Sequence, residues 1–295
     1  MNLTIHPLEV RVMTEIHPYS PEHGPELKAL TEDLHMPALE GFLRCPERIS
    51  IAVFQGRTVG WSYLSMPEDL LGSCFVYIYV SPSFRRRGAG RALYRYAWQK
   101  IERRQAECWS SYPPSEIADQ FAFSMGFDYV NTNSYMEYSG ICSGTHDGAI
   151  RPYADSDYPA APDIWTDEYA RMHTDLGLPY TPPDRTDAWR AAERAEYAQN
   201  AHLTFVMEDN GQIVGIGSLF DDNSGIGALA IDSRHGNKGY GTRLARFLTD
   251  ECLRRGCKTP HLYCETNNKS AFHLYQKIGY REISRESVAI KKFSV

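Results

Sequence analysis

The hydrophobic pattern of the first half of the chain predicts strands and helices in alternation. Two apolar, β-branched runs, residues 49–54 and 58–64, flank a Gln-Gly-Arg turn, an arrangement typical of a β-hairpin. A third run, residues 74–80, predicts a strand, and the apolar positions that follow it recur at helical spacing. These positions are Leu93, Tyr96, Ala97 and Ile101. Residues 107–111 and 115–125 then predict a further strand and a further helix.

The same order of elements returns in the second half. Residues 202–207 and 212–219 predict a hairpin around an Asp-Asn-Gly turn, and residues 226–231 predict a strand. The helix expected next has its apolar face at Leu244, Phe247, Leu248 and Cys252. Residues 260–265 and 269–278 complete the series as a strand and a helix.

Glycines mark this repeat. Gly239 lies 151 residues after Gly88, at the start of the corresponding helix, and Gly279 lies 153 residues after Gly126, at the end of the corresponding helix. Such similar offsets at separate motifs indicate two copies of one fold. A small, polar segment separates the copies. We therefore expect an N-terminal domain of residues 1–140, a linker of residues 141–148 and a C-terminal domain of residues 149–295.

Composition narrows the class of protein. The chain of 295 residues is 42% hydrophobic and 23% charged, which excludes a disordered protein and a membrane protein. Its seven cysteines are scattered without a C-x-x-C pair, so we expect no metal site, no disulfide framework and a cytoplasmic location. The net charge of −6 argues against a nucleic-acid partner. We also expect neither a signal peptide nor a membrane-spanning segment.

Glycines and arginines gather where the strand at residues 74–80 meets the following helix. Backbone amides at a helix N-terminus favour an anion, and guanidinium groups fit phosphate oxygens. The order of strand, proline, arginines and Gly-x-Gly favours a pyrophosphate-binding loop over a solvated run of surface charge. Its candidate residues are Val80, Arg85, Arg86, Arg87, Gly88, Ala89, Gly90 and Arg91.

This segment resembles the acetyl-CoA loop of the GNAT superfamily of N-acetyltransferases, which reads Arg/Gln-x-x-Gly-x-Gly/Ala after a strand that ends in Val-x-Pro. The residues that fill the pattern are Val80, Pro82, Arg85, Gly88 and Gly90. The resemblance implies an α/β fold, in which each half has a mixed, mostly antiparallel sheet flanked by helices. It also implies acetyl-CoA as the co-substrate and no metal.

The second half resembles the same superfamily at another motif. Residues 268–280 fit its Asn-x-x-Ala-x-x-Leu-Tyr-x-Lys-x-Gly-Tyr pattern. In the family, the matching asparagine contacts the pantetheine arm and the matching tyrosine protonates the departing thiolate, which implies these roles for Asn268 and Tyr275. The cofactor-binding residues expected in this half are Leu229, Ile231, Asn237, Lys238, Gly239, Tyr240, Gly241, Thr242, Asn268 and Tyr275.

The two copies depart from the family pattern at different places. In the first copy Ala122 stands where Tyr275 stands in the second, so another tyrosine would have to supply the hydroxyl. The candidates are Tyr77, Tyr79 and Tyr112. In the second copy Gly236 replaces the expected Arg or Gln, and Ser233 replaces the proline. We expect the C-terminal half to be catalytic, because a proton donor is harder to replace than one phosphate contact. This arrangement resembles the mycothiol synthase family in architecture, where the C-terminal half performs the chemistry.

A general base is also needed, because the acceptor ammonium must lose a proton before it attacks. Glu265 is our candidate, at the end of a strand that faces the expected cleft. Asp221 and Asp222 are alternatives, and His202 and His273 are weaker ones, since lone histidines are more often structural.

The sequence thus predicts an N-acetyltransferase that moves acetyl from acetyl-CoA to an amine of a small molecule by direct attack. We expect a monomer or a homodimer. The resemblance places the acceptor wall in residues 178–184, Tyr180 included, after a helix expected at residues 163–176. Two alternatives stay open: an acyl-CoA-binding sensor without turnover, and a peptide or protein N-acetyltransferase.

Overall fold

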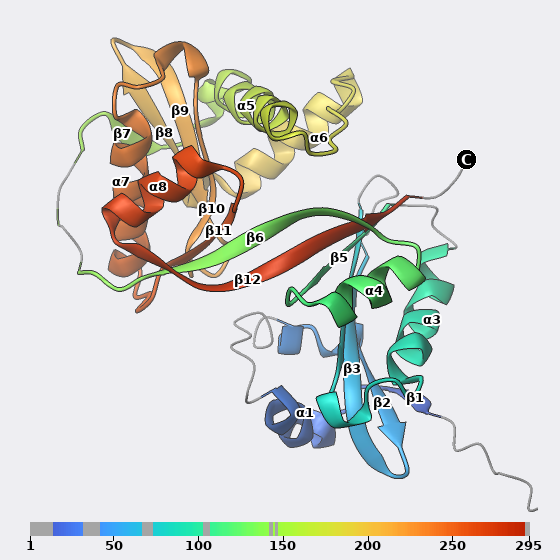
Figure 1. Ribbon diagram of the computed structural model, residues 1–295. Coiled ribbons are helices and arrows are strands. Elements are labelled where there is room, and N and C mark those ends of the chain that lie inside the picture. Colours follow the sequence, from blue (N-terminus) through green and yellow to red (C-terminus); the bar gives the residue numbers. More distant parts are fainter. Residues whose placement is uncertain are drawn as a thin grey trace, which may run out of the picture. The chain divides into compact units, whose positions relative to one another are not determined.

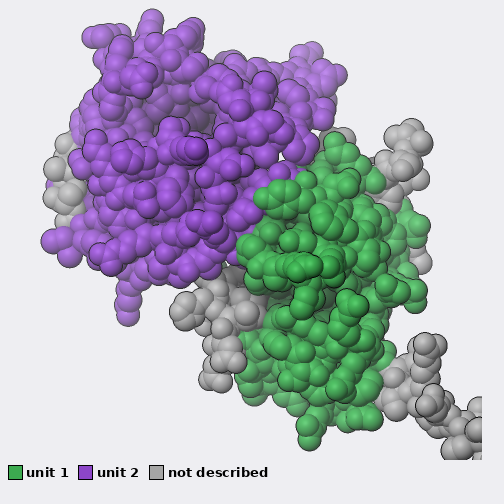
Figure 2. All heavy atoms as spheres, in the orientation of Figure 1, with its two compact units in different colours: residues 1–129, 287–295 green, residues 130–286 purple. Residues whose placement is uncertain are grey.

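The computed structural model describes residues 14–31, 42–66, 73–102, 107–141, 144 and 147–292. The chain forms two compact units, which Figure 2 distinguishes by colour. Unit 1 consists of residues 1–129 and 287–295, and unit 2 consists of residues 130–286.

The two units exchange their closing strands (Figure 1). Strand β6 (Asp128–Tyr138) follows the first half in sequence, yet it pairs antiparallel with β11 (His261–Glu265) in unit 2. In return, the last residues of β12 (Tyr280–Lys291) pair antiparallel with β5 (Cys108–Tyr112) in unit 1. A linear division of the sequence therefore does not describe these spatial units, and the domain boundaries at residues 141–148 stay a prediction about the repeat.

Unit 1 is a mixed sheet with helices against it. In chain order its elements are β1 (Glu15–Pro18), α1 (Gly24–Thr31), β2 (Ile49–Phe54), β3 (Arg57–Ser65), β4 (Cys74–Val80), η3 (Pro82–Phe84), α3 (Ala89–Ile101), β5 and α4 (Glu116–Ser124). The strands lie in the order β1-β2-β3-β4-β5-β12, and within the described residues of unit 1 the parallel pair is β4 with β5.

The core of unit 1 follows the expected helical pattern with one difference. Leu93, Ala97 and Ile101 of α3 are buried, as predicted, but Tyr96 is only half-buried. Tyr94 takes the buried position instead, and its hydroxyl donates a hydrogen bond of 3.1 Å to the Met125 carbonyl. A tyrosine can occupy the core there because its polar end has a partner.

Unit 2 repeats the arrangement. Its elements are β6, β7 (Ile150–Pro152), α5 (Ala160–Leu176), α6 (Asp187–Gln199), β8 (Thr204–Asp209), β9 (Gln212–Leu219), β10 (Ile226–Ile231), η7 (Ser233–His235), α7 (Tyr240–Arg254), β11, α8 (Lys269–Ile278) and most of β12. The expected hairpin is confirmed, and Asn210 and Gly211 at its turn both have positive φ, as a two-residue turn of the I′ type requires.

The strands of unit 2 form two groups that separate. One group has the order β10-β9-β8-β7, and in the other β6 lies between β11 and β12. Among the described residues, an isolated parallel bridge joins Gly225, the residue before β10, to His261, the first residue of β11. In unit 1, β4 and β5 stay paired for three positions, from Cys74 to Val76 on β4. The gap between the corresponding strands therefore opens earlier in unit 2.

The expected fold class, a mixed and mostly antiparallel sheet flanked by helices, is confirmed in both units. No helix in the described part of the chain combines the length and the apolar character that crossing a bilayer requires.

Candidate functional site

A cavity of about 640 Å³ lies in unit 2 where β10 and β11 diverge. Its walls come from these two strands, from α5 and from the first turns of α8. Five residues singled out in the sequence line it: Leu229, Ile231, Glu265, Asn268 and Tyr275. The fold thus brings together residues that lie up to 46 positions apart in the sequence.

Tyr275 is held in this cavity by the packing of α8. Its side chain is buried, with 9% of the residue exposed, and its ring makes an edge-on contact with Tyr280 at a centroid distance of 5.9 Å. Burial raises the pKa of the Tyr275 hydroxyl well above its usual value, and the nearby Cys264 and Glu265 add to the effect. The phenol therefore keeps its proton at neutral pH and is able to donate it.

Glu265 ends β11 and faces the same cavity. No cation of the described residues forms an ion pair with its carboxylate, and its charge acts on its neighbours. Burial raises the pKa of Tyr169 to about 12, and the Glu265 charge contributes to that rise. The other base candidates do not line the cavity; they are Asp221, Asp222, His202 and His273.

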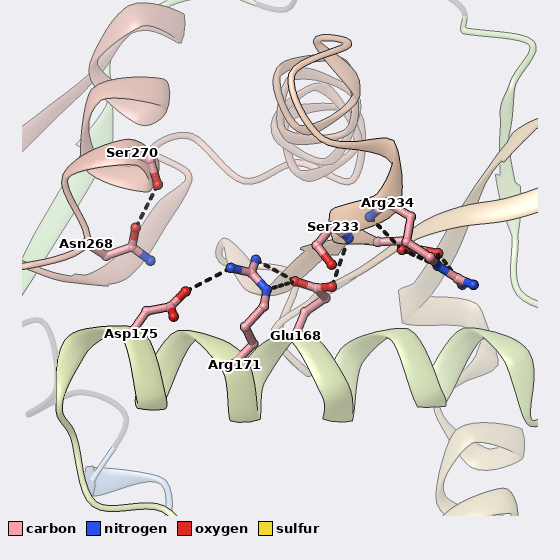
Figure 3. A network of polar contacts seen from close by, with 8 residues as sticks. Glu168, Arg171, Asp175, Ser233, Arg234, Asn268 and Ser270 are labelled. Atoms are coloured by element: carbon pink, nitrogen blue, oxygen red, sulfur yellow. Dashed lines mark hydrogen bonds and ion pairs between the residues drawn. The ribbon is translucent and has the colours of Figure 1, made fainter.

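Asn268 is the N-cap of α8 (Figure 3). Its side-chain oxygen accepts hydrogen bonds from the Ala271 backbone N–H, at 3.2 Å, and from the Ser270 hydroxyl, at 3.1 Å. The amide nitrogen of the same side chain makes no hydrogen bond within the described part of the chain. The cap thus fixes the side chain and leaves its N–H groups for a ligand.

One face of α5 forms a wall of the cavity that sequence reasoning missed. Its lining side chains Trp165, Glu168, Tyr169 and Met172 recur at helical spacing. The expected wall at residues 178–184 does not line the cavity, although the Tyr180 ring lies 5.1 Å from that of Tyr169. The missed signal is a stripe of aromatic and acidic residues on a helix that the sequence did predict.

Polar contacts connect this wall to the loop after β10 (Figure 3). Arg171 donates to Glu168, at 2.8 Å from Nε, and to Asp175, at 2.9 Å from Nη1. The second oxygen of Glu168 accepts a hydrogen bond of 2.8 Å from the Ser233 backbone N–H. Ser233 is the first residue of η7, which leads into the predicted phosphate loop.

The two predicted phosphate loops have the same backbone conformation. Arg86 and Gly88 have φ values of 64° and 93°, and Asn237 and Gly239, which lie 151 positions later, have values of 62° and 81°. Each glycine is the N-cap of the following helix, α3 or α7. Both loops therefore present backbone N–H groups at a helix N-terminus, the arrangement that binds phosphate.

The charged side chains of the two loops differ. In unit 1, Arg85 donates to the Val80 carbonyl at 3.0 Å, and Arg87 lies over the Phe84 ring. The remaining candidates there are the exposed Arg86 and Arg91 and the first-turn residues Ala89 and Gly90. In unit 2, Lys238 lies over the Tyr240 ring, with 5.8 Å from Nζ to the ring centroid. Gly241 and Thr242 belong to the first turn of α7, and residues 237–242 lie outside the cavity lining.

Arg86 has a left-handed backbone, with φ of 64°, which is unfavourable for arginine. Left-handed backbone costs an ordinary residue about 1 kcal/mol or more, whereas asparagine adopts it more readily. We expect Arg86→Asn to stabilise unit 1 by about 1 kcal/mol, measured as a higher midpoint of urea unfolding. An unchanged or lower midpoint would show that the Arg86 side chain makes up for the strained backbone.

Unit 1 has a smaller counterpart of the cavity, about 70 Å³, which Ala122, Phe121 and Tyr112 help to line. Ala122 offers no hydroxyl, as the sequence indicated. Of the substitute tyrosines, Tyr112 lines this cavity, and burial raises its pKa to about 12. Tyr79 instead donates its hydroxyl to the Leu30 carbonyl at 2.9 Å.

His173 is a buried residue of α5, and its ring lies 4.4 Å from that of Tyr169. Burial lowers the pKa of His173 below the usual value of 6.5. The unfolded chain therefore binds a proton at His173 more readily than the folded chain does. Above about pH 6.5 neither state binds that proton, and the histidine does not change the free energy of unfolding. Stability is lost as the pH falls below that value, down to the folded-state pKa. We expect His173→Phe, which keeps a ring, to show a smaller loss between about pH 7.5 and pH 5.5 in urea unfolding. Equal losses for both proteins would contradict this prediction.

Comparison with known proteins places these features in a family. The model of the acetyltransferase (GNAT) family matches residues 11–127 and again residues 165–280. The chain is 25% identical over 189 residues to the uncharacterized N-acetyltransferase YobR of Bacillus subtilis, which covers 62% of this chain and 71% of the relative.

Solved structures with the same fold cover nearly the whole chain. A GCN5-related N-acetyltransferase from Sphaerobacter thermophilus aligns with 98% of this chain and 99% of its own, with a TM-score of 0.66 and 18% identity. A tandem GNAT protein from the clavulanic acid biosynthesis pathway aligns with 94% of this chain and 98% of its own, with a TM-score of 0.58 and 15% identity. The duplication expected from the sequence is confirmed by the two family matches.

Proposed function

The chain belongs to the acetyltransferase (GNAT) family, and from this premise we propose that unit 2 transfers acetyl from acetyl-CoA to an amine of a small molecule. The observation that carries the proposal is the cavity of about 640 Å³ that Tyr275 and Glu265 line together. Tyr275 is a buried phenol that keeps its proton, and Glu265 is a carboxylate without an ion-pair partner in the described structure. A proton donor and a proton acceptor in one cavity are what acyl transfer to an amine requires.

In the proposed reaction, Glu265 takes the proton of the acceptor ammonium, directly or through water. The neutral amine nitrogen then forms a bond to the thioester carbonyl carbon, and the carbon–sulfur bond breaks. The Tyr275 hydroxyl gives its proton to the departing sulfur, and the second proton that leaves the nitrogen as the amide forms returns to the Tyr275 oxygen, directly or through water. The products are the N-acetylated amine and CoA, and Glu265 releases the first proton to solvent, so atoms and charges balance.

Backbone groups of β10 complete the proposed site. The pairing of β10 with β9 is interrupted between Ile226 and Ala228, which leaves Gly227 outside the regular ladder while it lines the cavity. A bulged residue has an unpaired N–H group, and such a donor suits an oxygen that gains negative charge. We assign this role to the Gly227 N–H, and Leu229 and Ile231, which pair with Gly217 and Gly215 of β9, line the cavity beside it.

The residues present fit acetyl-CoA as the co-substrate. Lys238 and the backbone N–H groups of residues 237–242 would hold its phosphates, since no carboxylate of the described residues neutralises Lys238. The free amide N–H groups of Asn268 would contact the pantetheine arm. In unit 1 the arginine-bearing loop at residues 85–91 would offer a second phosphate site beside a cavity of only about 70 Å³.

Purified protein with acetyl-CoA and a panel of small amines tests the proposal, with free CoA release as the readout and bound CoA per chain as a second measurement. We expect turnover with at least one small amine. Tight CoA binding without turnover on a broad panel would favour the sensor, and turnover only with peptides would favour a peptide acetyltransferase. Absence of CoA binding at both loops would overturn the proposal.

A further inference from the structure

Glu168 connects the α5 wall of the cavity to the segment that leads into the phosphate loop. One carboxylate oxygen accepts the Ser233 backbone N–H at 2.8 Å, and the other accepts two N–H groups of Arg171. Only 12% of the Glu168 side chain is exposed. Figure 3 shows this carboxylate between the helix and the loop. A carboxylate that accepts three hydrogen bonds, two of them from one guanidinium group, holds its partners in a defined geometry, although Arg171 and Ser233 are themselves exposed.

The bond to Ser233 is specific to unit 2. The matching residue of unit 1, 151 positions earlier, is Pro82, and proline has no N–H group. The surrounding turn is otherwise the same, because η3 and η7 each begin with this residue and follow an N-cap residue with φ of −50°. A serine in place of proline therefore adds one backbone donor without a change of fold.

We propose that Glu168 is a positioning residue that couples the phosphate loop to the acceptor wall. Through Ser233, a loop held by bound phosphates also holds α5, and with it Trp165, Tyr169 and Met172 against the cavity. The inference rests on the proposed function, because it assumes that CoA binds at residues 237–242 and the acceptor binds beside α5. Glu168 itself acts on α5 and the loop and has no part in the proton transfers.

Ser233→Pro removes the backbone N–H that Glu168 accepts and changes no residue of α5. The backbone accepts this change, since Asp232 before it has ψ of 120°, in the range preferred before proline, and proline is common at the first position of a helical turn. Ser233→Ala is the matched control, because it removes the hydroxyl and keeps the N–H. Amide hydrogen exchange of residues 160–176 and 237–250, with and without added CoA, reports on both elements.

We expect α5 amides of the ligand-free Ser233→Pro protein to exchange roughly fivefold or more faster than those of the wild type and of Ser233→Ala. CoA should slow exchange in both segments of the wild type, but only in residues 237–250 of Ser233→Pro. Equal α5 exchange in all three ligand-free proteins would overturn the coupling. A wild-type protein in which CoA protects neither segment would count against the proposed function, while the ligand-free comparison still decides on Glu168.

Kinetics with the best amine of the panel separate positioning from stability. Glu168→Ala and Ser233→Pro should each raise the KM for the amine about tenfold with a smaller change in kcat, and the double variant should be no worse than either. Glu168→Gln keeps an oxygen that accepts the Ser233 N–H and should restore most of the loss. Asp167→Ala is the control, because it removes the neighbouring carboxylate of α5, which pairs with Arg185 and does not line the cavity. A lower Tm with an unchanged KM would show that Glu168 only stabilises the fold.

Discussion

Tyr275→Phe is expected to lower turnover roughly tenfold or more, about 1.4 kcal/mol of activation barrier, with little change in acetyl-CoA binding. The variant removes one hydroxyl and keeps the ring that packs against Tyr280, so the cavity keeps its shape. The proposed mechanism makes this hydroxyl the source of the proton for the departing sulfur. Because it acts at the breaking bond, its loss should lower kcat and leave the KM for acetyl-CoA nearly constant.

Two matched variants control for the loss of a tyrosine hydroxyl. Tyr263→Phe changes a second tyrosine of the same cavity and should leave kcat close to the wild-type value. Tyr280→Phe removes a buried hydroxyl that lies 2.9 Å from the Thr249 hydroxyl, so it should cost about 1 kcal/mol of stability and little activity. Should Tyr275→Phe turn over at the wild-type rate, another group must protonate the sulfur.

Gly239→Asp is expected to raise the KM for acetyl-CoA roughly tenfold or more, whereas Gly88→Asp should leave turnover nearly unchanged. Both glycines have positive φ and cap the helix behind a phosphate loop, and a Cβ at either position meets no atom within 4 Å. The new carboxylate therefore meets no steric clash, although the left-handed backbone is strained for any side chain, and its charge repels a phosphate. Steady-state kinetics with acetyl-CoA, together with CoA bound per chain, measure the two effects separately.

Asparagine variants at the same positions isolate the charge. Gly239→Asn has nearly the shape of the aspartate variant and the same left-handed backbone, so it should lose much less affinity for acetyl-CoA.

The two aspartate variants also test which half is catalytic. If Gly88→Asp stops turnover and Gly239→Asp does not, the reaction belongs to unit 1 and the assignment of Tyr275 fails.

The sequence predicted the elements and the repeat well, because both depend on local periodicity. The strand β10 and the helix α8 follow from apolar spacing, whereas the N-cap role of Asn268 was not predicted. Tyr275 was predicted from the family motif and Glu265 from its position at a strand end, and both line the same cavity. Their chemical roles stay predictions.

Two features lie beyond local pattern. The wall formed by α5 depends on which face of that helix packs beside β10 and β11. The spacing of apolar residues predicts which face of a helix is buried, but not the elements against which it packs. The exchange of β6 and β12 depends on pairing between segments some 130 to 180 residues apart, such as Ser134 with Cys264 and Ser111 with Val288. Either half of the repeat supplies an equally suitable strand, so apolar alternation does not determine which unit receives it.

Because of the strand exchange, the sheet of unit 1 cannot be completed until residues 287–291 of β12 have been synthesised. Synthesis proceeds from the N-terminus, and domains generally fold in that order, yet β5, which pairs with β4 on one side, receives its second partner only when residues 287–291 have emerged. Ala289 and Ile290, both buried in the finished protein, are made about 180 residues after their partners Ser110 and Trp109. While the residues between them are synthesised, the nascent chain therefore exposes one edge of β5, a surface that chaperones recognise and that favours aggregation.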